Sequence, residues 1–383
     1  PSTAFVDLSG NSFEGISDAT SLSFTTHSLT QIGKDINGEA SGDYSGRSIS
    51  LSADGSVVAI GATGNDGNGE KSGHVRIYQN NNGSWTQIGN DIDGEAKKDY
   101  SGGSVSLSAD GSIVAIGATS NDGKSYFNTN RSGHVRIYQN NNGSWTQIGN
   151  DIDGEAAGDT SGGSVSLSAD GSIVAIGAIN NSDNGSYSGH VRIYQNNNGS
   201  WTQIGNDIDG EAQYDSSGRS VSLSADGSIV AIGATGNDGN GENSGHVRIY
   251  QNDNGNWVKI GNDIDGEAQY DSSGGSVSLS ADGSVVAVGA NGHGTNNEGL
   301  IRVYKNVNNN WTKIGNDIKG EYSQDQLGSY ISLSSDGLTL ATGGSRGSSY
   351  MDIPRGFVKV YKNIDNVWTE ISELEGQADS DSL

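Results

Sequence analysis

The chain has 383 residues, a formal net charge of −25 and a sequence pI near 4.3. Such a charge repels phosphate backbones and anionic lipid headgroups, which excludes nucleic acid and membrane surfaces as expected partners. No apolar stretch approaches the about 18 residues of a membrane-spanning helix, so direct membrane insertion is not expected, and the sequence from Pro1 lacks the basic and apolar regions of a secretory leader.

An internal repeat of about 56 residues organises the chain. Ser-Ala-Asp-Gly occurs five times and Ser-Ser-Asp-Gly follows as a sixth copy, with spacings of 56, 60, 56, 56 and 54 residues. The copies end at Gly55, Gly111, Gly171, Gly227, Gly283 and Gly337. A regular period of this kind is typical of solenoids and propellers. Residues 41–383 are therefore predicted to be six near-identical repeats within one domain that spans residues 1–383.

Each repeat contains four predicted strands, which we call A to D in chain order. Residues 102–118 form two β-branched runs joined at Asp110-Gly111, a dipeptide typical of a tight hairpin. Residues 133–149 form two further strands around an Asn/Gly turn. Strand B, residues 113–118, is apolar on both faces, which is expected if neighbouring sheets cover both. The pattern predicts an all-β propeller with four-stranded antiparallel blades.

The number of blades is predicted from the outer D strands. One D strand covers residues 29–33, and the other six begin at tryptophans: Trp85, Trp145, Trp201, Trp257, Trp311 and Trp368. Residues 6–19 and 22–27 align passably with strands A to C. We therefore predict a seven-bladed β-propeller in which residues 1–40 are a degenerate first blade. The alternative is six blades with an N-terminal appendage.

The unit resembles the FG-GAP repeat of integrin-α-type propellers and their bacterial and algal relatives. The resemblance is carried by Gly-x-Ser-Val-x-Leu-Ser-x-Asp-Gly, then Val-Ala-Ile-Gly-Ala, then Ser-Gly-His-Val-Arg-Ile-Tyr, over nearly the whole chain. It implies a seven-bladed propeller at the cell surface or outside the cell, with a role in adhesion or protein binding rather than catalysis.

The sequence departs from this family in two respects. The Phe-Gly dipeptide is replaced by Ser101-Gly102 or Leu327-Gly328, and the Gly-Ala-Pro triplet has lost its proline at Thr119. The calcium loop that such repeats often carry between their first two strands is here a tight turn at residues 109–112. One carboxylate cannot supply the six to eight oxygens that calcium takes. The calcium positions of the family therefore do not carry over.

Three kinds of repeated side chain are interpreted as parts of the scaffold. His74, His134, His190 and His246 occupy a position that holds Leu300 and Phe357 in the last two repeats, which favours packing over metal binding. The six tryptophans lie in strand D, which favours packing between blades over sugar stacking. A conserved strand-C cation is expected to pair with nearby carboxylates: Arg76, Arg136, Arg192, Arg248, Arg302 or Lys359.

Acidic residues concentrate in the connections from strand D to the next strand A, which hold 26 of the 46 Asp and Glu residues. Their close spacing resembles calcium-loop chemistry without matching the EF-hand pattern. Calcium is accordingly the one cofactor we expect, and the alternative is a solvated face of turn-capping carboxylates. The candidate metal ligands are Asp91, Asp93, Glu95, Asp99, Asp151, Asp153, Glu155, Asp159, Asp207, Asp209, Glu211, Asp215, Asp263, Asp265, Glu267 and Asp271.

The B–C loops differ most between copies, and up-and-down topology places them beside the D–A loops on one face of the propeller. Variable loops on a constant scaffold are where binding specificity resides. Residues that break the repeat in these loops are the candidate ligand contacts: Tyr126, Arg131, Tyr187, Arg346 and Tyr350.

The sequence thus predicts a non-enzymatic extracellular or cell-surface module that binds a protein or a glycan through this loop face, with calcium as a possible aid. The alternative is a structural spacer or assembly unit, because residue 383 falls just before the register of another strand A. An enzyme is not expected, since no nucleophile motif or cluster of basic residues is present.

Overall fold

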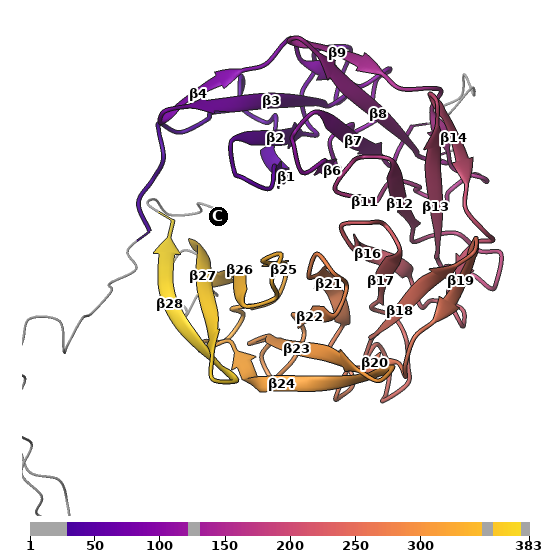
Figure 1. Cartoon of the computed structure of the whole chain (residues 1–383), viewed down its shortest axis with the longest axis vertical. Coiled ribbons are helices and arrows are strands. Elements are labelled where there is room, and N and C mark those ends of the chain that lie inside the picture. Colours follow the sequence, from indigo (N-terminus) through magenta and orange to yellow (C-terminus); the bar gives the residue numbers. More distant parts are fainter. Residues whose placement is uncertain (1–28, 122–130, 347–354, 377–383) are drawn as a thin grey trace, which may run out of the picture. The chain divides into compact units, whose positions relative to one another are not determined.

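The computed structural model describes residues 29–121, 131–346 and 355–376, which form six antiparallel β-sheets around a common axis (Figure 1). They belong to the compact unit of residues 31–383. The described residues contain no helix that could cross a membrane.

Four blades share the same set of five strands. In the first they are β1 (Ser45–Leu51), β2 (Val57–Ala62), β3 (His74–Asn81), β4 (Ser84–Gln87) and β5 (Ile92–Asp93). In the second they are β6 (Ser104–Leu107), β7 (Ile113–Ala118), β8 (His134–Asn141), β9 (Ser144–Gln147) and β10 (Ile152–Asp153). In the third they are β11 (Ser164–Leu167), β12 (Ile173–Ala178), β13 (His190–Asn197), β14 (Ser200–Gln203) and β15 (Ile208–Asp209). In the fourth they are β16 (Ser217–Leu223), β17 (Ile229–Ala234), β18 (His246–Asp253), β19 (Asn256–Lys259) and β20 (Ile264–Asp265).

The last two blades have four strands each because strand D is continuous. They consist of β21 (Ser273–Leu279), β22 (Val285–Ala290), β23 (Leu300–Val307) and β24 (Asn310–Lys319), then β25 (Tyr330–Leu333), β26 (Thr339–Arg346), β27 (Arg355–Ile364) and β28 (Val367–Glu375). In the other blades strand D is split, and both pieces pair with strand C, as β14 and β15 do with β13. The predicted four-stranded antiparallel blade is therefore confirmed.

The structure shows six blades, so the prediction of seven is wrong and the six-bladed alternative holds. Residues 1–28, which make up most of the predicted degenerate blade, lie outside the described residues. The predicted D strand at residues 29–33 is not a strand. Instead, Ile32 O accepts a hydrogen bond of 2.9 Å from Trp85 Nε1, as Ile88 O does from Trp145 Nε1. Residues 29–33 resemble strand D in sequence because they accept the same tryptophan hydrogen bond that the end of strand D accepts from the next blade.

The A–B hairpin forms where the Asp-Gly signal predicts it. Gly111 has a φ of +69°, and Asp110 Oδ1 accepts hydrogen bonds from Ser108 Oγ and Ser112 N. Positive φ is readily adopted only by glycine, so the tetrapeptide Ser-Ala-Asp-Gly fixes this turn. A second glycine, Gly117 in strand B, packs so closely on Gly162 of the next blade that a Cβ would collide with its carbonyl oxygen.

The hydrophobic core consists of five separate clusters, one between each pair of consecutive blades. The cluster between the third and fourth blades contains Ala175 and Ile193 from one side and Leu223, Ile232 and Tyr250 from the other. Burial of strand B from both sides explains its continuous apolar pattern. No blade has a core of its own, so each blade depends on its neighbours.

Hydrogen bonds between inner strands repeat at the same five junctions. The main-chain N–H of a strand-A leucine donates to a serine Oγ of the preceding blade, at distances of 2.9–3.0 Å. These pairs are Leu107 with Ser50, Leu167 with Ser106, Leu223 with Ser166, Leu279 with Ser222, and Leu333 with Ser278. The serines of strand A therefore hold blades together.

The ring is not closed between the last and first blades among the described residues. No hydrogen bond of the recurring type joins Leu51 N to Ser332 Oγ, and Figure 1 shows β25 and β1 on the two sides of a break. Leu51 is 56% exposed, whereas its counterpart Leu223 is 8% exposed. The face of β1 that points away from the second blade, its outward face, thus lacks the neighbouring blade that every following inner strand has.

Candidate functional site

The B–C and D–A loops of a blade form one continuous surface, as the predicted topology requires. In the third blade, Tyr214 N donates to Ser186 O at 2.8 Å and Ser216 N donates to Tyr187 O at 3.1 Å. Asn184 Nδ2 adds a hydrogen bond of 2.7 Å to Gly210 O. Equivalent main-chain bonds join the two loops in other blades, for example Tyr270 N to Glu242 O. The variable loops are therefore anchored on the acidic ones.

The predicted ligand contacts lie in part on this surface. Arg131 and Tyr187 occupy equivalent positions at the end of a B–C loop, and both have positive φ, +40° and +54°. Tyr187 is exposed and stacks on Tyr214 of the neighbouring D–A loop, with ring centroids 6.0 Å apart. Tyr126 and Tyr350 lie outside the described residues, and Arg346 ends β26, where only its backbone is described.

Exposed tyrosines in the D–A loops are a feature that the sequence analysis did not single out. They are at least half exposed and comprise Tyr44, Tyr214, Tyr270 and Tyr322. A tyrosine among the polar residues of a loop, rather than in a strand, is the sequence signal that could have identified them. Aromatic side chains of this kind supply much of the contact energy at protein interfaces.

The candidate carboxylates of one D–A loop do not gather at one point. In the loop that follows β9, Asp151 lies by His134 of its own blade, whereas Glu155 lies by His190 of the next blade. Asp159 is buried and accepts hydrogen bonds from Ala156 N and Asn181 Nδ2. Asp99, Asp215 and Asp271 also accept the bond from the residue three positions earlier. The last carboxylate of each of these loops therefore caps the backbone of its own loop. Calcium binding at these loops stays a prediction.

The structure brings a different set of residues together in each of the first four blades. A glutamate from the preceding D–A loop, the strand-C histidine and the first aspartate of the following D–A loop have ligand atoms within 4.8 Å of one another. The groups are Glu39, His74 and Asp91; Glu95, His134 and Asp151; Glu155, His190 and Asp207; and Glu211, His246 and Asp263. Seven of the predicted carboxylate ligands thus lie beside a histidine, in groups drawn from two loops, and metal binding by them stays a prediction.

The arginine of strand C lies beside the same group, as predicted. Arg192 NH1 is 3.4 Å from Glu155 Oε1, and its NH2 donates to Asp153 O at 2.7 Å. Its guanidinium also lies 5.6 Å from the ring centroid of Tyr194. Arg192 is 5% exposed, so this cation is held in a buried frame of partners.

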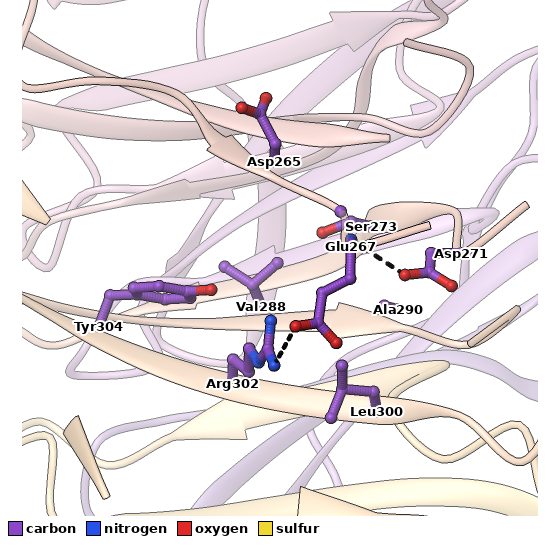
Figure 2. A pocket seen from close by; sticks show the side chains of 10 residues that line it. Asp265, Glu267, Asp271, Ser273, Val288, Ala290, Leu300, Arg302 and Tyr304 are labelled. Atoms are coloured by element: carbon purple, nitrogen blue, oxygen red, sulfur yellow. Dashed lines mark hydrogen bonds and ion pairs between the residues drawn. The ribbon is translucent and has the colours of Figure 1, made fainter. Parts of the chain in front are cut away.

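The junction between the fourth and fifth blades shows the arrangement without a histidine (Figure 2). Leu300 takes the histidine position there, in a pocket also lined by Asp265, Glu267 and Arg302. Arg302 makes a bidentate pair with Asp317, at 2.9 and 2.8 Å, and an ion pair with Glu267. Leucine therefore fits the scaffold at this position.

Burial and local charge shift the pKa values of these groups. The pKa of His134 is lowered to about 4. Desolvation is the largest cause, Arg136 adds to the lowering, and Asp151 opposes it. The pKa values of His190 and His246 are also lowered, mainly by desolvation. Desolvation raises the pKa of Glu155, with Arg192 opposing and Asp207 and Asp183 adding to the rise. The three imidazoles are therefore neutral at pH 7.

Sequence reasoning assigned the histidines to packing because leucine and phenylalanine replace them. That inference correctly identified a buried position, since His190 is fully buried, but it did not place the side chain among carboxylates. The constant spacing of 17 residues between each histidine and its aspartate, as in His190 and Asp207, was the available signal.

Comparisons with known proteins agree with this fold. Residues 208–250 match the family model described as FG-GAP repeat. Among solved structures, a 6-phosphogluconolactonase candidate from Bacteroides uniformis is 13% identical with a TM-score of 0.57, over 86% of this chain and 88% of that one. The periplasmic gluconolactonase PpgL of Pseudomonas aeruginosa is 15% identical with a TM-score of 0.54, over 88% and 86%.

Saccharomyces cerevisiae Sqt1 is 14% identical with a TM-score of 0.50, over 88% of this chain and 77% of that one. None of the curated proteins searched matches the chain. At these identities the structural matches show the propeller fold and nothing about activity. The matched segment, residues 208–250, begins at β15 and runs through strands A to C of the fourth blade, and its pattern recurs in the other blades. The chain is a β-propeller whose fourth blade contains an FG-GAP repeat at residues 208–250.

Proposed function

We propose that the chain is a non-catalytic binding or adhesion module at the cell surface or outside the cell, which recognises a protein or a glycan through its B–C and D–A loop face. The observation that carries the proposal is the stacked pair Tyr187 and Tyr214, exposed on loops that are hydrogen-bonded to each other. Aromatic residues on a preorganised loop surface bind ligands at low entropic cost.

The repetition of the polar groups supports a non-catalytic role. The His and carboxylate group occurs in four blades, and leucine replaces the histidine at Leu300. A catalytic constellation acts at one place in a fold, whereas a scaffold feature is copied with the repeat. The calcium dependence predicted from the acidic loops is part of the same proposal.

The experiment compares binding of the wild-type chain and the double variant Tyr187→Ser/Tyr214→Ser to a glycan array and to immobilised cell-surface proteins, with calcium and with EGTA. We expect the double variant to bind about tenfold or more weakly, because two aromatic contacts are lost. The matched control is Val307→Ser, an exposed residue in the C–D turn on the opposite face.

Two outcomes would contradict the proposal. One is that the wild-type chain binds none of the glycans or proteins in either condition. The other is that Val307→Ser weakens binding as much as the double variant does. An effect of EGTA on the wild type would support a role for calcium, and the absence of an effect would remove calcium from the proposal.

The open ring favours a second candidate, a structural unit of a larger assembly. Ile49 and Leu51 on β1 are 65% and 56% exposed, although their counterparts in other blades face a neighbouring sheet. Exposed apolar faces at the end of a repeat array are suited to contact with another blade. Sedimentation of the wild type and of Ile49→Ser/Leu51→Ser distinguishes the candidates, since only an assembly unit would lose a concentration-dependent association.

A further inference from the structure

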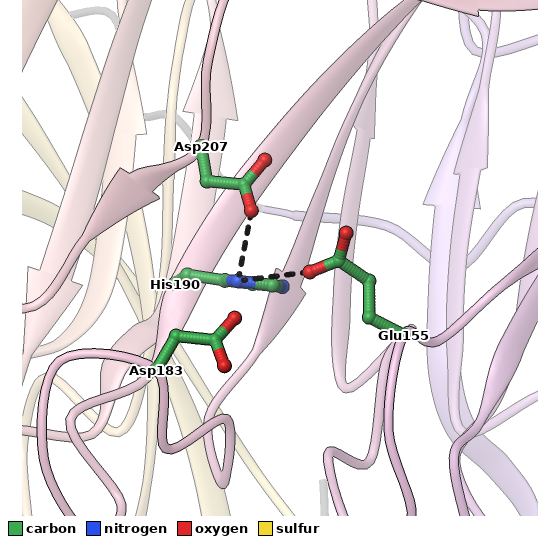
Figure 3. A group of neighbouring side chains, drawn as sticks. All are labelled: Glu155, Asp183, His190 and Asp207. Atoms are coloured by element: carbon green, nitrogen blue, oxygen red, sulfur yellow. Dashed lines mark ion pairs between the residues drawn. The ribbon is translucent and has the colours of Figure 1, made fainter.

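One of the four histidine groups contains an additional carboxylate. Asp183, from the B–C loop of the third blade, joins Glu155, His190 and Asp207, and the ligand atoms of all four residues lie within 4.8 Å of one another (Figure 3). The equivalent position is Gly67 in the first blade and Gly239 in the fourth, where no side chain is available. The third blade thus differs from the first and fourth blades at this position.

His190 is a buried polar side chain without a hydrogen-bond partner. It is 1% exposed as a side chain, and both Nδ1 and Nε2 lack a hydrogen bond among the described residues. Nδ1 lies 3.6 Å from Asp207 Oδ2 and 3.9 Å from Glu155 Oε2, which is close but beyond hydrogen-bonding distance. A buried polar atom left without a partner destabilises the fold, so such an atom calls for a ligand.

The spacing of these atoms fits a small cation. Zinc binds imidazole nitrogen and carboxylate oxygen at about 2.0–2.2 Å in a tetrahedron, so neighbouring ligand atoms lie about 3.4 Å apart. The separations of 3.6 and 3.9 Å from Nδ1 to Asp207 and Glu155 are within about 0.5 Å of this value, and all four ligand atoms lie within 4.8 Å of one another. Figure 3 shows the His190 ring between the carboxylates of Glu155, Asp183 and Asp207.

The electrostatics favour a cation as well. Three carboxylates face one guanidinium, that of Arg192, so the group is net negative. Glu155, Asp183 and Asp207 are partly or largely exposed, which leaves an entry path from solvent.

We propose that Glu155, Asp183, His190 and Asp207 form a binding site for a divalent transition-metal ion of the zinc type. The imidazole ligand separates this site from a calcium site, because calcium takes oxygen ligands and zinc takes nitrogen and oxygen together. The side chains that support the ligands are Gln203, whose Nε2 donates to Asp207 Oδ1 at 2.6 Å, and Asn181, whose Nδ2 donates to Asp183 Oδ2 at 3.3 Å.

The repeats supply two matched variants that the fold already tolerates. His190→Leu copies Leu300 of the fifth blade and removes the nitrogen ligand. Asp183→Gly copies Gly67 and Gly239 and removes only the fourth ligand. Circular dichroism and thermal unfolding without metal should show both variants folded like the wild type.

The test is a titration of the metal-free chain with Zn²⁺ against a chromophoric chelator, followed by Co²⁺ absorption spectra. We expect one tightest Zn²⁺ site in the wild type, weakened about tenfold or more in Asp183→Gly and lost in His190→Leu. The wild-type Co²⁺ complex should show d–d bands of four-coordinate geometry that are absent from His190→Leu.

Three outcomes would overturn the proposal. The first is equal Zn²⁺ stoichiometry and affinity in the wild type and in a folded His190→Leu chain. The second is an affinity of Asp183→Gly equal to that of the wild type. The third is displacement of Zn²⁺ by an equal concentration of Ca²⁺, which would indicate an oxygen-only site.

Discussion

At the scale of single residues, the strand-C position two residues before the conserved cation is histidine in four blades and apolar in the last two. Where it is histidine, as in His190, the neighbouring Arg192 contacts Glu155 and the carbonyl of Asp153. Where it is Leu300, Arg302 instead makes a bidentate pair with Asp317. Leu300 therefore provides an apolar reference, within the same molecule, for a buried imidazole with a lowered pKa.

The pH dependence of stability follows from that comparison. His134 has a pKa of about 4 in the folded chain against 6.5 in the unfolded one, so protonation favours unfolding. The stability linked to neutral His134 is fully present above pH 6.5 and is lost as the pH falls toward 4. We expect His134→Leu to reduce the loss of stability between pH 7 and pH 5 by about 1–2 kcal/mol.

Urea unfolding of both proteins at the two pH values, with EDTA present, measures this difference. The groups that face His134, namely Arg136, Asp151 and Glu95, are retained in both proteins, so their own titration largely cancels. The same loss of stability in the two proteins would show that His134 does not contribute.

At the scale of elements, the strands and the A–B turn could be predicted because their signals are local. Asp110-Gly111 fixes the hairpin, and the apolar run from Ile113 to Ala118 indicates a strand covered on both sides. The interruption of strand D after Gln203 could not be predicted, since a two-residue strand such as β15 carries no pattern of its own. The role of the strand-A serines could not be predicted either, since they accept hydrogen bonds from the next blade across the junction.

Serine to alanine substitutions test this role of strand A. Ser166→Ala removes the acceptor for the Leu223 main-chain N–H and should cost about 1–2 kcal/mol of stability. Ser332→Ala alters the equivalent position of the last blade, which has no following blade among the described residues, and should cost close to nothing. Chemical unfolding of the two variants measures the contrast. Equal effects would mean that the serines act within their own blade.

At the scale of the whole molecule, the six repeats predict six blades, and the count of D strands adds a seventh that the described residues do not form. Residues 29–33 resemble strand D in sequence because Ile32 receives the same tryptophan hydrogen bond as Ile88 does. Glu155 and Asp207 could be predicted as candidate ligands, but their grouping with Asp183 and His190 could not, since the four residues come from three loops and a strand of two consecutive blades. Only the ring arrangement places one blade's loop against the next blade's strand C.

The open junction gives a prediction with an internal control. Leu223→Ala should cost about 2–4 kcal/mol, because the side chain is buried between two blades. Leu51→Ala, at the same position of the first blade, should cost less than about 1 kcal/mol because that side chain is 56% exposed. Equilibrium unfolding of the two variants checks the difference. Equal costs would show that something covers the outward face of β1 in solution.

The separate clusters between blades also fix the order in which the molecule comes apart. The first and sixth blades each have one described neighbour, whereas the four between them have two. In an array stabilised by nearest-neighbour contacts, the end units lose their structure at the lowest free energy. Opening therefore proceeds from the two ends toward the third and fourth blades, so their shared cluster around Ile193 and Leu223 is the last to open.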